Sequence, residues 1–148
     1  MDEGQLANQL SALGLSPRVA VTTNGTWYTT WRETDDAGHA LIYADLIGSS
    51  GIVTIADTRT PFFLNPWTGE ETPVLIYAQD GAHTIIPLDL AGNQTVIISF
   101  SHAKIQSVVP TYHISSAPSG VVGASFNSGE GLALHVSAAV KVGEAVLY

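Results

Sequence analysis

The amino-acid sequence predicts an all-β protein, an antiparallel β-sandwich preceded by a short N-terminal helix. Two observations after Pro17 favour this fold. Short runs rich in Thr, Val, Ile and aromatic residues recur there, and turn residues separate them about every 8 to 12 residues. No segments suited to crossover helices lie between the runs, which argues against a parallel sheet. A chain of 148 residues is long enough for one domain with its own hydrophobic core.

The helical prediction covers residues 5–13. Three leucines with i, i+4 and i+7 spacing fall on one face there: Leu6, Leu10 and Leu13. Gly14 is a natural helix stop, and Pro17 prevents the helix from resuming. We therefore expect residues 1–17 to form a helical linker and residues 18–148 to form the β-sandwich domain.

The strands are predicted from β-branched and aromatic residues between turn signals. Asp35-Asp36-Ala37-Gly38 breaks the first hairpin, and Asp80-Gly81 is the strongest hairpin signal in the sequence. A segment rich in Gly, Ser, Pro and Asn, residues 115–131, is expected to be a loop or a boundary. The expected strands are residues 26–34, 40–47, 52–56, 72–79, 82–88, 95–100, 111–115, 132–137 and 140–147.

The composition excludes several classes of partner. Apolar residues make up 45% of the chain and charged residues 12%, about half the usual charged share. The net charge is −8, and the five basic residues are never adjacent in the sequence. Such a chain repels a phosphate backbone and an anionic membrane, so we expect no nucleic acid and no membrane among its partners. A neutral ligand or a neighbouring protein domain remains compatible with this charge.

The residues that usually carry catalysis form no recognisable arrangement. Cysteine is absent, the five histidines are dispersed, and neither HExxH nor Gly-x-Ser-x-Gly occurs. Glycoside hydrolysis needs two carboxylates facing each other across a cleft. The adjacent pairs Asp35-Asp36 and Glu70-Glu71 diverge if extended, which leaves Asp45, Asp57 and Asp89 as candidates. We expect no enzyme activity, no metal and no cofactor in this chain.

The sequence contains no run of roughly 20 apolar residues that could span a bilayer. Its first residues lack the basic start and apolar stretch of a signal peptide. If the parent protein is secreted, we expect this chain to be an excised piece of it.

The segment Asn65-Pro66-Trp67-Thr68-Gly69-Glu70 has the composition of a tight turn. Proline presets φ early in a turn, and glycine supplies a positive φ at its exit. Trp67 then either packs on the sandwich edge, the favoured interpretation, or offers an exposed ring to a sugar, with Asn65, Arg32 and Glu70 as candidate polar neighbours.

Trp27 and Trp31 form a second candidate for carbohydrate binding. Side chains alternate along a strand, so these two rings share one face, while Arg32 lies on the other. Packing against an opposite sheet explains the same residues without a ligand. Separately, Asn24-Gly25-Thr26 and Asn93-Gln94-Thr95 have the form of N-glycosylation sites, and both fall at expected turns.

The stretch from Pro61 to Val74, with Pro-Phe-Phe-Leu-Asn-Pro-Trp-Thr-Gly-Glu at its start, is distinctive. So is its continuation, Asp80-Gly81 followed by Ile86-Pro87-Leu88-Asp89-Leu90-Ala91-Gly92-Asn93-Gln94-Thr95. Together they resemble a β-sandwich domain of large secreted, rhamnosidase-like glycoside hydrolases of fungi and bacteria. The resemblance covers about residues 19–102.

The resemblance implies a non-catalytic accessory module beside a catalytic domain, with neighbouring domains of a larger chain as its partners and an extracellular location. The alternative is a carbohydrate-binding module that holds an oligosaccharide on exposed Trp rings.

Overall fold

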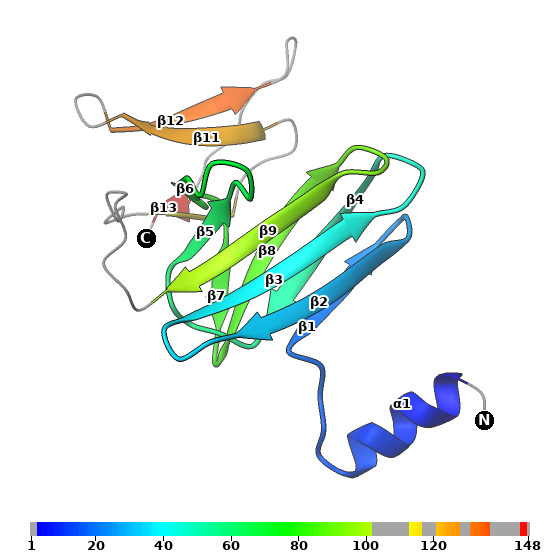
Figure 1. The fold of residues 1–148 in the computed structure, drawn as a ribbon. Helices are drawn as coiled ribbons and strands as arrows, with labels where there is room; N and C mark the ends of the chain where they lie inside the picture. The colour runs from blue at the N-terminus through cyan, green and yellow to red at the C-terminus, as the bar shows by residue number, and fades with distance from the viewer. Residues whose placement is uncertain (1–2, 102–112, 117–120, 128–130, 137–145, 148) are drawn as a thin grey trace.

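The predicted β-sandwich with one short helix is confirmed. The computed structural model describes residues 3–101, 113–116, 121–127, 131–136 and 146–147, and the side chains of residues 4–101 and 113–115. Two antiparallel sheets face each other in the part of the chain up to residue 101 (Figure 1). The apolar sides of the two sheets meet between them, where the hydrophobic core lies.

Each sheet is built from strands that are scattered along the chain, and all of the pairings within them are antiparallel. The five-stranded sheet has the order β2 (Trp27–Glu33), β3 (Ala37–Ala44), β9 (Thr95–Ser101), β5 (Pro61–Leu64) and β6 (Glu71–Pro73). The four-stranded sheet has the order β1 (Val19–Thr23), β4 (Ser49–Ile55), β8 (His83–Leu90) and β7 (Ala78–Asp80).

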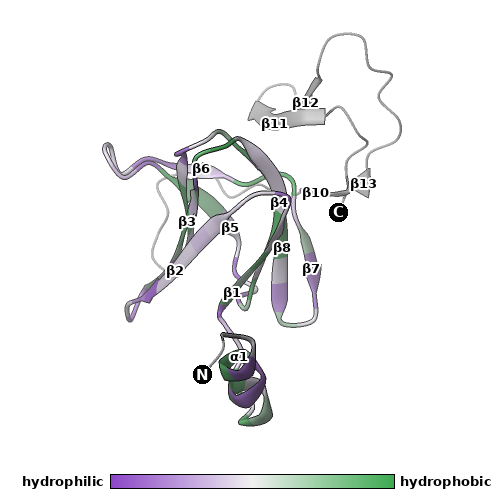
Figure 2. Cartoon of the chain, turned by 90° about the vertical axis from the view of Figure 1, so that its right-hand side faces the viewer, coloured by the Kyte–Doolittle hydropathy of each residue, from purple (hydrophilic) through white to green (hydrophobic). Residues whose placement is uncertain are grey.

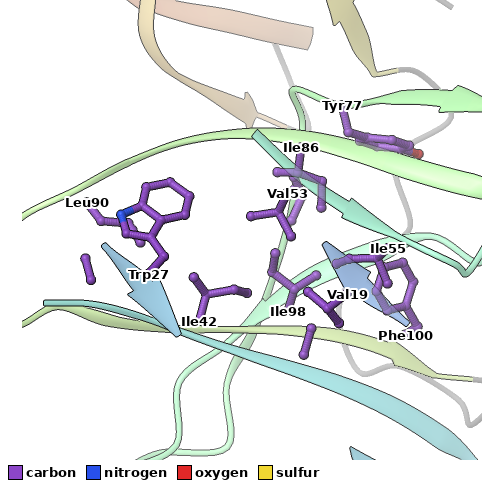
Figure 3. Close-up of a cluster of buried hydrophobic side chains, with 13 residues drawn as sticks. Val19, Trp27, Ile42, Val53, Ile55, Tyr77, Ile86, Leu90, Ile98 and Phe100 are labelled. Atoms are coloured by element: carbon purple, nitrogen blue, oxygen red, sulfur yellow. The ribbon is translucent and has the colours of Figure 1, made fainter. Parts of the chain in front are cut away.

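The core follows from the alternation of side chains along these strands. On β3, Ala40, Ile42 and Ala44 are fully buried, while the residues between them are more exposed. Figure 3 shows Ile42 and Ile98 from one sheet facing Val53 and Ile86 from the other. Burying one such aliphatic side chain contributes about 1.5–3 kcal/mol, so these contacts hold the two sheets together.

Helix α1 (Glu3–Ala12) lies away from the sandwich (Figures 1 and 2). The chain leaves it through Gly14, which has a φ of 73° and confirms the predicted stop. The leucines of its predicted face remain exposed: Leu6, Leu10 and Leu13. The helix therefore forms without packing on the described part of the sandwich.

The prediction of one strand over residues 72–79 is wrong. Within that range β6 belongs to the five-stranded sheet and β7 to the four-stranded sheet. Between them the chain crosses from one sheet to the other, and Val74, Leu75 and Tyr77 are buried on the way. Two consecutive buried residues do not fit a strand with one buried face, because strand side chains alternate.

The C-terminal strands form two small two-stranded sheets, β10–β13 and β11–β12. Strand β11 falls inside residues 115–131, so the expectation of a loop is wrong for residues 121–127, where the backbone pairs with β12. That this segment marks a boundary stays a prediction, and residues 140–145 of an expected strand lie outside the described residues. The four strands are β10 (Ile114–Ser116), β11 (Val121–Asn127), β12 (Gly131–Val136) and β13 (Val146–Leu147).

Candidate functional site

The predicted turn from Asn65 to Glu70 joins β5 to β6. The backbone N–H of Asn65 donates to the carbonyl of Glu70 at 2.9 Å, and that of Gly69 donates to the carbonyl of Asn65 at 2.8 Å. The side-chain oxygen of Asn65 accepts a hydrogen bond from the backbone N–H of Trp67 at 3.0 Å. Gly69 has a φ of 72°, which confirms its predicted role at the turn exit. The backbone that carries Trp67 is therefore well fixed.

Trp67 projects from this turn with 93% of its surface exposed. Its polar neighbours Asn65 and Glu70 are exposed as well. The favoured interpretation, packing of Trp67 on the sandwich edge, is wrong within the described residues. A large ring on a fixed backbone can bind a sugar ring or enter a hollow on another protein, since indole combines an apolar face with one polar N–H.

Trp27 is not available to a ligand. It is 7% exposed and lies in the core between the sheets (Figure 3). Its indole nitrogen donates to the hydroxyl of Ser49 on the facing sheet at 2.8 Å. The hypothesis that Trp27 forms part of a sugar platform is therefore wrong, and Trp27 is a core residue.

Trp31 shares the inner face with Trp27, as predicted, but it lies nearer the edge and is half-buried. Its ring lies 6.2 Å from the ring of Phe100, and the guanidinium of Arg18 lies 5.0 Å from its centroid. Its indole nitrogen donates to Glu33 at 3.3 Å. These contacts cover much of the ring, so Trp31 does not form an open platform.

Arg32 is exposed on the outer side of β2. In the strand order of its sheet, β3 and β9 separate β2 from β5, which leads into the turn with Trp67. Neighbouring strands lie about 4.8 Å apart, so this places three strand spacings between them. The structure therefore does not bring Arg32 and Trp67 into one site.

A polar cluster at the α1 end of the sandwich was missed by sequence analysis. The side chain of Arg59 donates to both carboxylate oxygens of Asp57, at 2.6 Å from Nη2 to Oδ2 and 3.0 Å from Nε to Oδ1. Glu33 lies 4.0 Å from Arg59 and 3.3 Å from Arg18. The cluster joins residues beside β1 and after β4 to the end of β2, across the two sheets. The only sequence signal was the short spacing of Asp57 and Arg59.

The contacts within this cluster favour the ionised form of Asp57, one of the candidate catalytic carboxylates. Burial raises the pKa of the Asp57 carboxyl, but hydrogen bonds from the side chain and backbone of Arg59 outweigh burial. The pKa of Asp57 consequently lies below its ordinary value. Asp57 is thus a carboxylate at neutral pH and is occupied by Arg59, an arrangement that suits a structural ion pair rather than a general acid.

Three connections lie close together at the opposite end of the sandwich. Strand β2 starts where β3 finishes, and β9 starts there too. We call this the loop end (Figure 1). Its connections are residues 24–26, 45–48 and 91–94. The turn after β5 lies apart from them, because β5 pairs with β9 only as far as Phe63–Ile98, whereas β3 continues to Tyr43–Thr95.

The β3–β4 connection exposes two apolar side chains at the loop end. Leu46 is 74% exposed and Ile47 is 75% exposed. Leu46 has a φ of 57°, in the left-handed region that branched side chains rarely adopt. The side-chain oxygen of Asn93 accepts hydrogen bonds from the backbone N–H of Leu46 at 3.3 Å and from the hydroxyl of Tyr43 at 2.8 Å.

The turn at residues 91–94 can approach the β3–β4 connection closely because residue 92 is a glycine. A Cβ at Gly92 would lie 2.2 Å from the carbonyl oxygen of Leu46, so any larger residue would displace this connection. Sequence analysis gave no sign of this arrangement, because it depends on two connections that are more than 40 residues apart in the chain.

The two sequons also lie at the loop end. Asn24 and Asn93 are both exposed and both lie in connections between strands, as predicted. The side-chain oxygen of Asn24 accepts a hydrogen bond from the backbone N–H of Ser50 at 3.0 Å. In both Asn24 and Asn93, the side-chain oxygen therefore accepts a hydrogen bond from a backbone N–H.

Within the described residues, no group of three or more His, Asp or Glu side chains is placed to hold a metal ion. Among the same residues, no helix is long and apolar enough to cross a membrane.

Comparison with known proteins shows a likeness to a solved structure. No protein-family profile matches the sequence, and no curated protein matches it either. The fold is similar to part of the solved rhamnosidase from Novosphingobium sp. PP1Y, with a TM-score of 0.59 and 16% sequence identity. The similarity covers 92% of this chain and 14% of the rhamnosidase chain. At this level of identity the likeness shows the fold, and this chain corresponds to about one seventh of that protein.

Proposed function

We propose that this chain is a non-catalytic accessory module of a secreted glycoside hydrolase and that it supports the catalytic domain beside it. The observation that carries the proposal is the fold similarity, which extends over nearly the whole chain but over only 14% of a rhamnosidase. A domain of this size beside a catalytic domain acts through its surface, and its own side chains need not perform chemistry.

The described carboxylates support the non-catalytic part of the proposal. Asp57 is held by Arg59, and Glu33 lies within ion-pair distance of Arg18 and Arg59. Asp89 accepts a hydrogen bond from the hydroxyl of Ser50. Hydrolysis of a glycosidic bond needs two carboxyl groups that face each other across a cleft. Asp57, Glu33 and Asp89 are instead each paired with a basic side chain or a hydroxyl.

A deletion in the parent enzyme tests the proposal. We expect removal of the module to lower the thermal stability or the activity of the parent, because a supported domain loses buried interface area. The isolated 148-residue chain should not hydrolyse an aryl glycoside. A parent enzyme that keeps both its activity and its melting temperature without the module would overturn the proposal.

The exposure of Trp67 favours a second candidate function, a carbohydrate-binding module. A sugar would stack on this ring, with Asn65 and Glu70 as hydrogen-bonding neighbours. Trp27 and Trp31 drop out of this hypothesis because their rings face the opposite sheet. Retention of the chain in a gel containing a plant-wall polysaccharide, lost in Trp67→Ala, would support it.

Secretion of the parent protein belongs to the same proposal. The exposed sequons Asn24 and Asn93 support a eukaryotic secretory origin, because glycosylation requires accessible Asn side chains in surface turns. Expression in a eukaryotic secretory host, followed by deglycosylation and mass measurement, tests it. A chain of unchanged mass would contradict glycan attachment.

A further inference from the structure

We propose that the loop end of the sandwich, centred on Leu46 and Ile47, is the surface by which this module docks on a neighbouring domain of its parent protein. This inference rests on the proposed function and names the surface that would carry it. The docked partner would present an apolar hollow with a basic rim.

Two large apolar side chains are exposed side by side in the chain at the loop end. Leu46 is 74% exposed and Ile47 is 75% exposed, and among the large apolar side chains of the described sandwich only Trp67 is more exposed. Trp67 lies on the turn after β5, apart from the loop end, so Leu46 and Ile47 are the centre of this surface. Exposed apolar side chains of this kind mark a protein interface.

The backbone holds Leu46 in an unfavourable conformation. Its φ of 57° lies in the left-handed region, where the Cβ of a leucine crowds the following carbonyl oxygen. The bonds to Asn93 and the close approach of Gly92 maintain it. The connection is thus ordered before a partner arrives, which reduces the entropy lost on docking.

The charge of this surface selects the partner. The connections at the loop end contain one carboxylate, Asp45, and no Lys or Arg. The whole chain also carries a net charge of −8. A second copy of this acidic surface would repel the first, whereas a partner with basic residues around an apolar hollow would complement it. This favours a different domain over a dimer of this chain.

Substitutions in the parent enzyme test the surface, with thermal inactivation as the readout. The test variant is Leu46→Asn with Ile47→Thr, because asparagine tolerates a positive φ and threonine suits an exposed position. The matched control is Ile52→Thr, an exposed apolar residue in the middle of β4. A third variant lacks the whole module, and Asp45→Lys tests the predicted basic rim.

We expect the double variant to shorten the inactivation half-life at least threefold, toward that of the module-deleted enzyme. Ile52→Thr should stay within about 1.5-fold of the original enzyme, and Asp45→Lys should shorten the half-life about twofold. The isolated chain with the double substitution should melt no lower than the original chain, which separates docking from folding. If it unfolds, Leu46→Asn alone replaces it, since that change retains the preferred φ.

The outcomes separate the two proposals. If module deletion destabilises the enzyme and the double variant does not, the loop end is not the docking surface and the proposed function stands. If deletion has no effect, the proposed function fails and this inference falls with it. Asn24 and Asn93 lie at the same end as Leu46, so glycans attached to them would overturn docking by this surface and leave the proposed function standing. A dimer of the isolated chain in sedimentation, dissolved by the double substitution, would overturn the choice of partner.

Discussion

Arg59 and Asp57 form a bidentate ion pair at the α1 end of the sandwich, with 2.6 Å between Nη2 and Oδ2. The Asp57 side chain is 5% exposed and that of Arg59 is 19% exposed. Water therefore screens this pair weakly, and either charge would be costly without the other.

Arg59→Ala should destabilise the protein by about 3 kcal/mol, because it leaves the Asp57 carboxylate buried without its partner. Chemical denaturation in urea measures the change. Arg32→Ala is the control, since Arg32 is exposed and has no ion pair within the described residues, and it should stay within about 0.5 kcal/mol. Equal effects of the two substitutions would contradict a structural role for the pair.

Truncation of Trp27 should lower the stability of the protein strongly, whereas truncation of Trp67 should hardly change it, because the first ring is buried and the second is exposed. Trp27→Ala removes a buried ring and should cost about 3–5 kcal/mol of stability. Trp67→Ala removes a ring that is 93% exposed and should change stability by less than about 0.5 kcal/mol. Acrylamide quenching gives a second measurement, since the accessible fraction of the emission should disappear in Trp67→Phe.

Gly69→Ala should cost about 1–2 kcal/mol through backbone strain alone. A Cβ at Gly69 would meet no atom within 4 Å, so the expected loss of stability comes from the φ of 72° and not from a steric clash with neighbouring atoms. Gly4 is the matched control, because its surroundings are equally open and its conformation is helical. Gly4→Ala should leave the urea midpoint unchanged. A neutral Gly69→Ala would show that the turn relaxes to another conformation.

His113 should make the protein less stable at mildly acidic pH. Its ring stacks on Tyr77 with centroids 3.9 Å apart, and burial lowers the pKa of His113 below its ordinary value. Folding therefore favours the neutral imidazole, and this contribution is fully present above about pH 6.5. It is lost as the pH falls from there toward the lower pKa of the folded state.

Melting temperatures between pH 7.5 and pH 5 test this dependence. His113→Phe keeps an aromatic ring against Tyr77 and should flatten part of the decline. His83→Gln, a substitution of an exposed residue on β8, should leave the decline as it is. A decline that is identical in His113→Phe would assign the acid sensitivity to other groups.

The candidate site was only partly predictable from the sequence, for reasons that particular residues show. Alternation correctly placed Trp27 and Trp31 on one face, but only the pairing of β2 with β3 and the position of the second sheet made that face the inner one. Residues 72–79 were predicted as one strand because β propensity does not encode a change of sheet. The loop end was missed because it depends on a contact between Leu46 and Asn93.

The sequence by itself determined the local features of this protein. The turn from Asn65 to Glu70 and the hairpin at Asp80-Gly81 follow from residues next to one another, since Pro, Gly and Asn fix the backbone within a few positions. Tertiary structure decided which tryptophan is buried, the partner of Asp57, and the end of the sandwich that exposes Leu46. These depend on residues that are distant in the chain, and burial and long-range pairing exist only once the two sheets have packed.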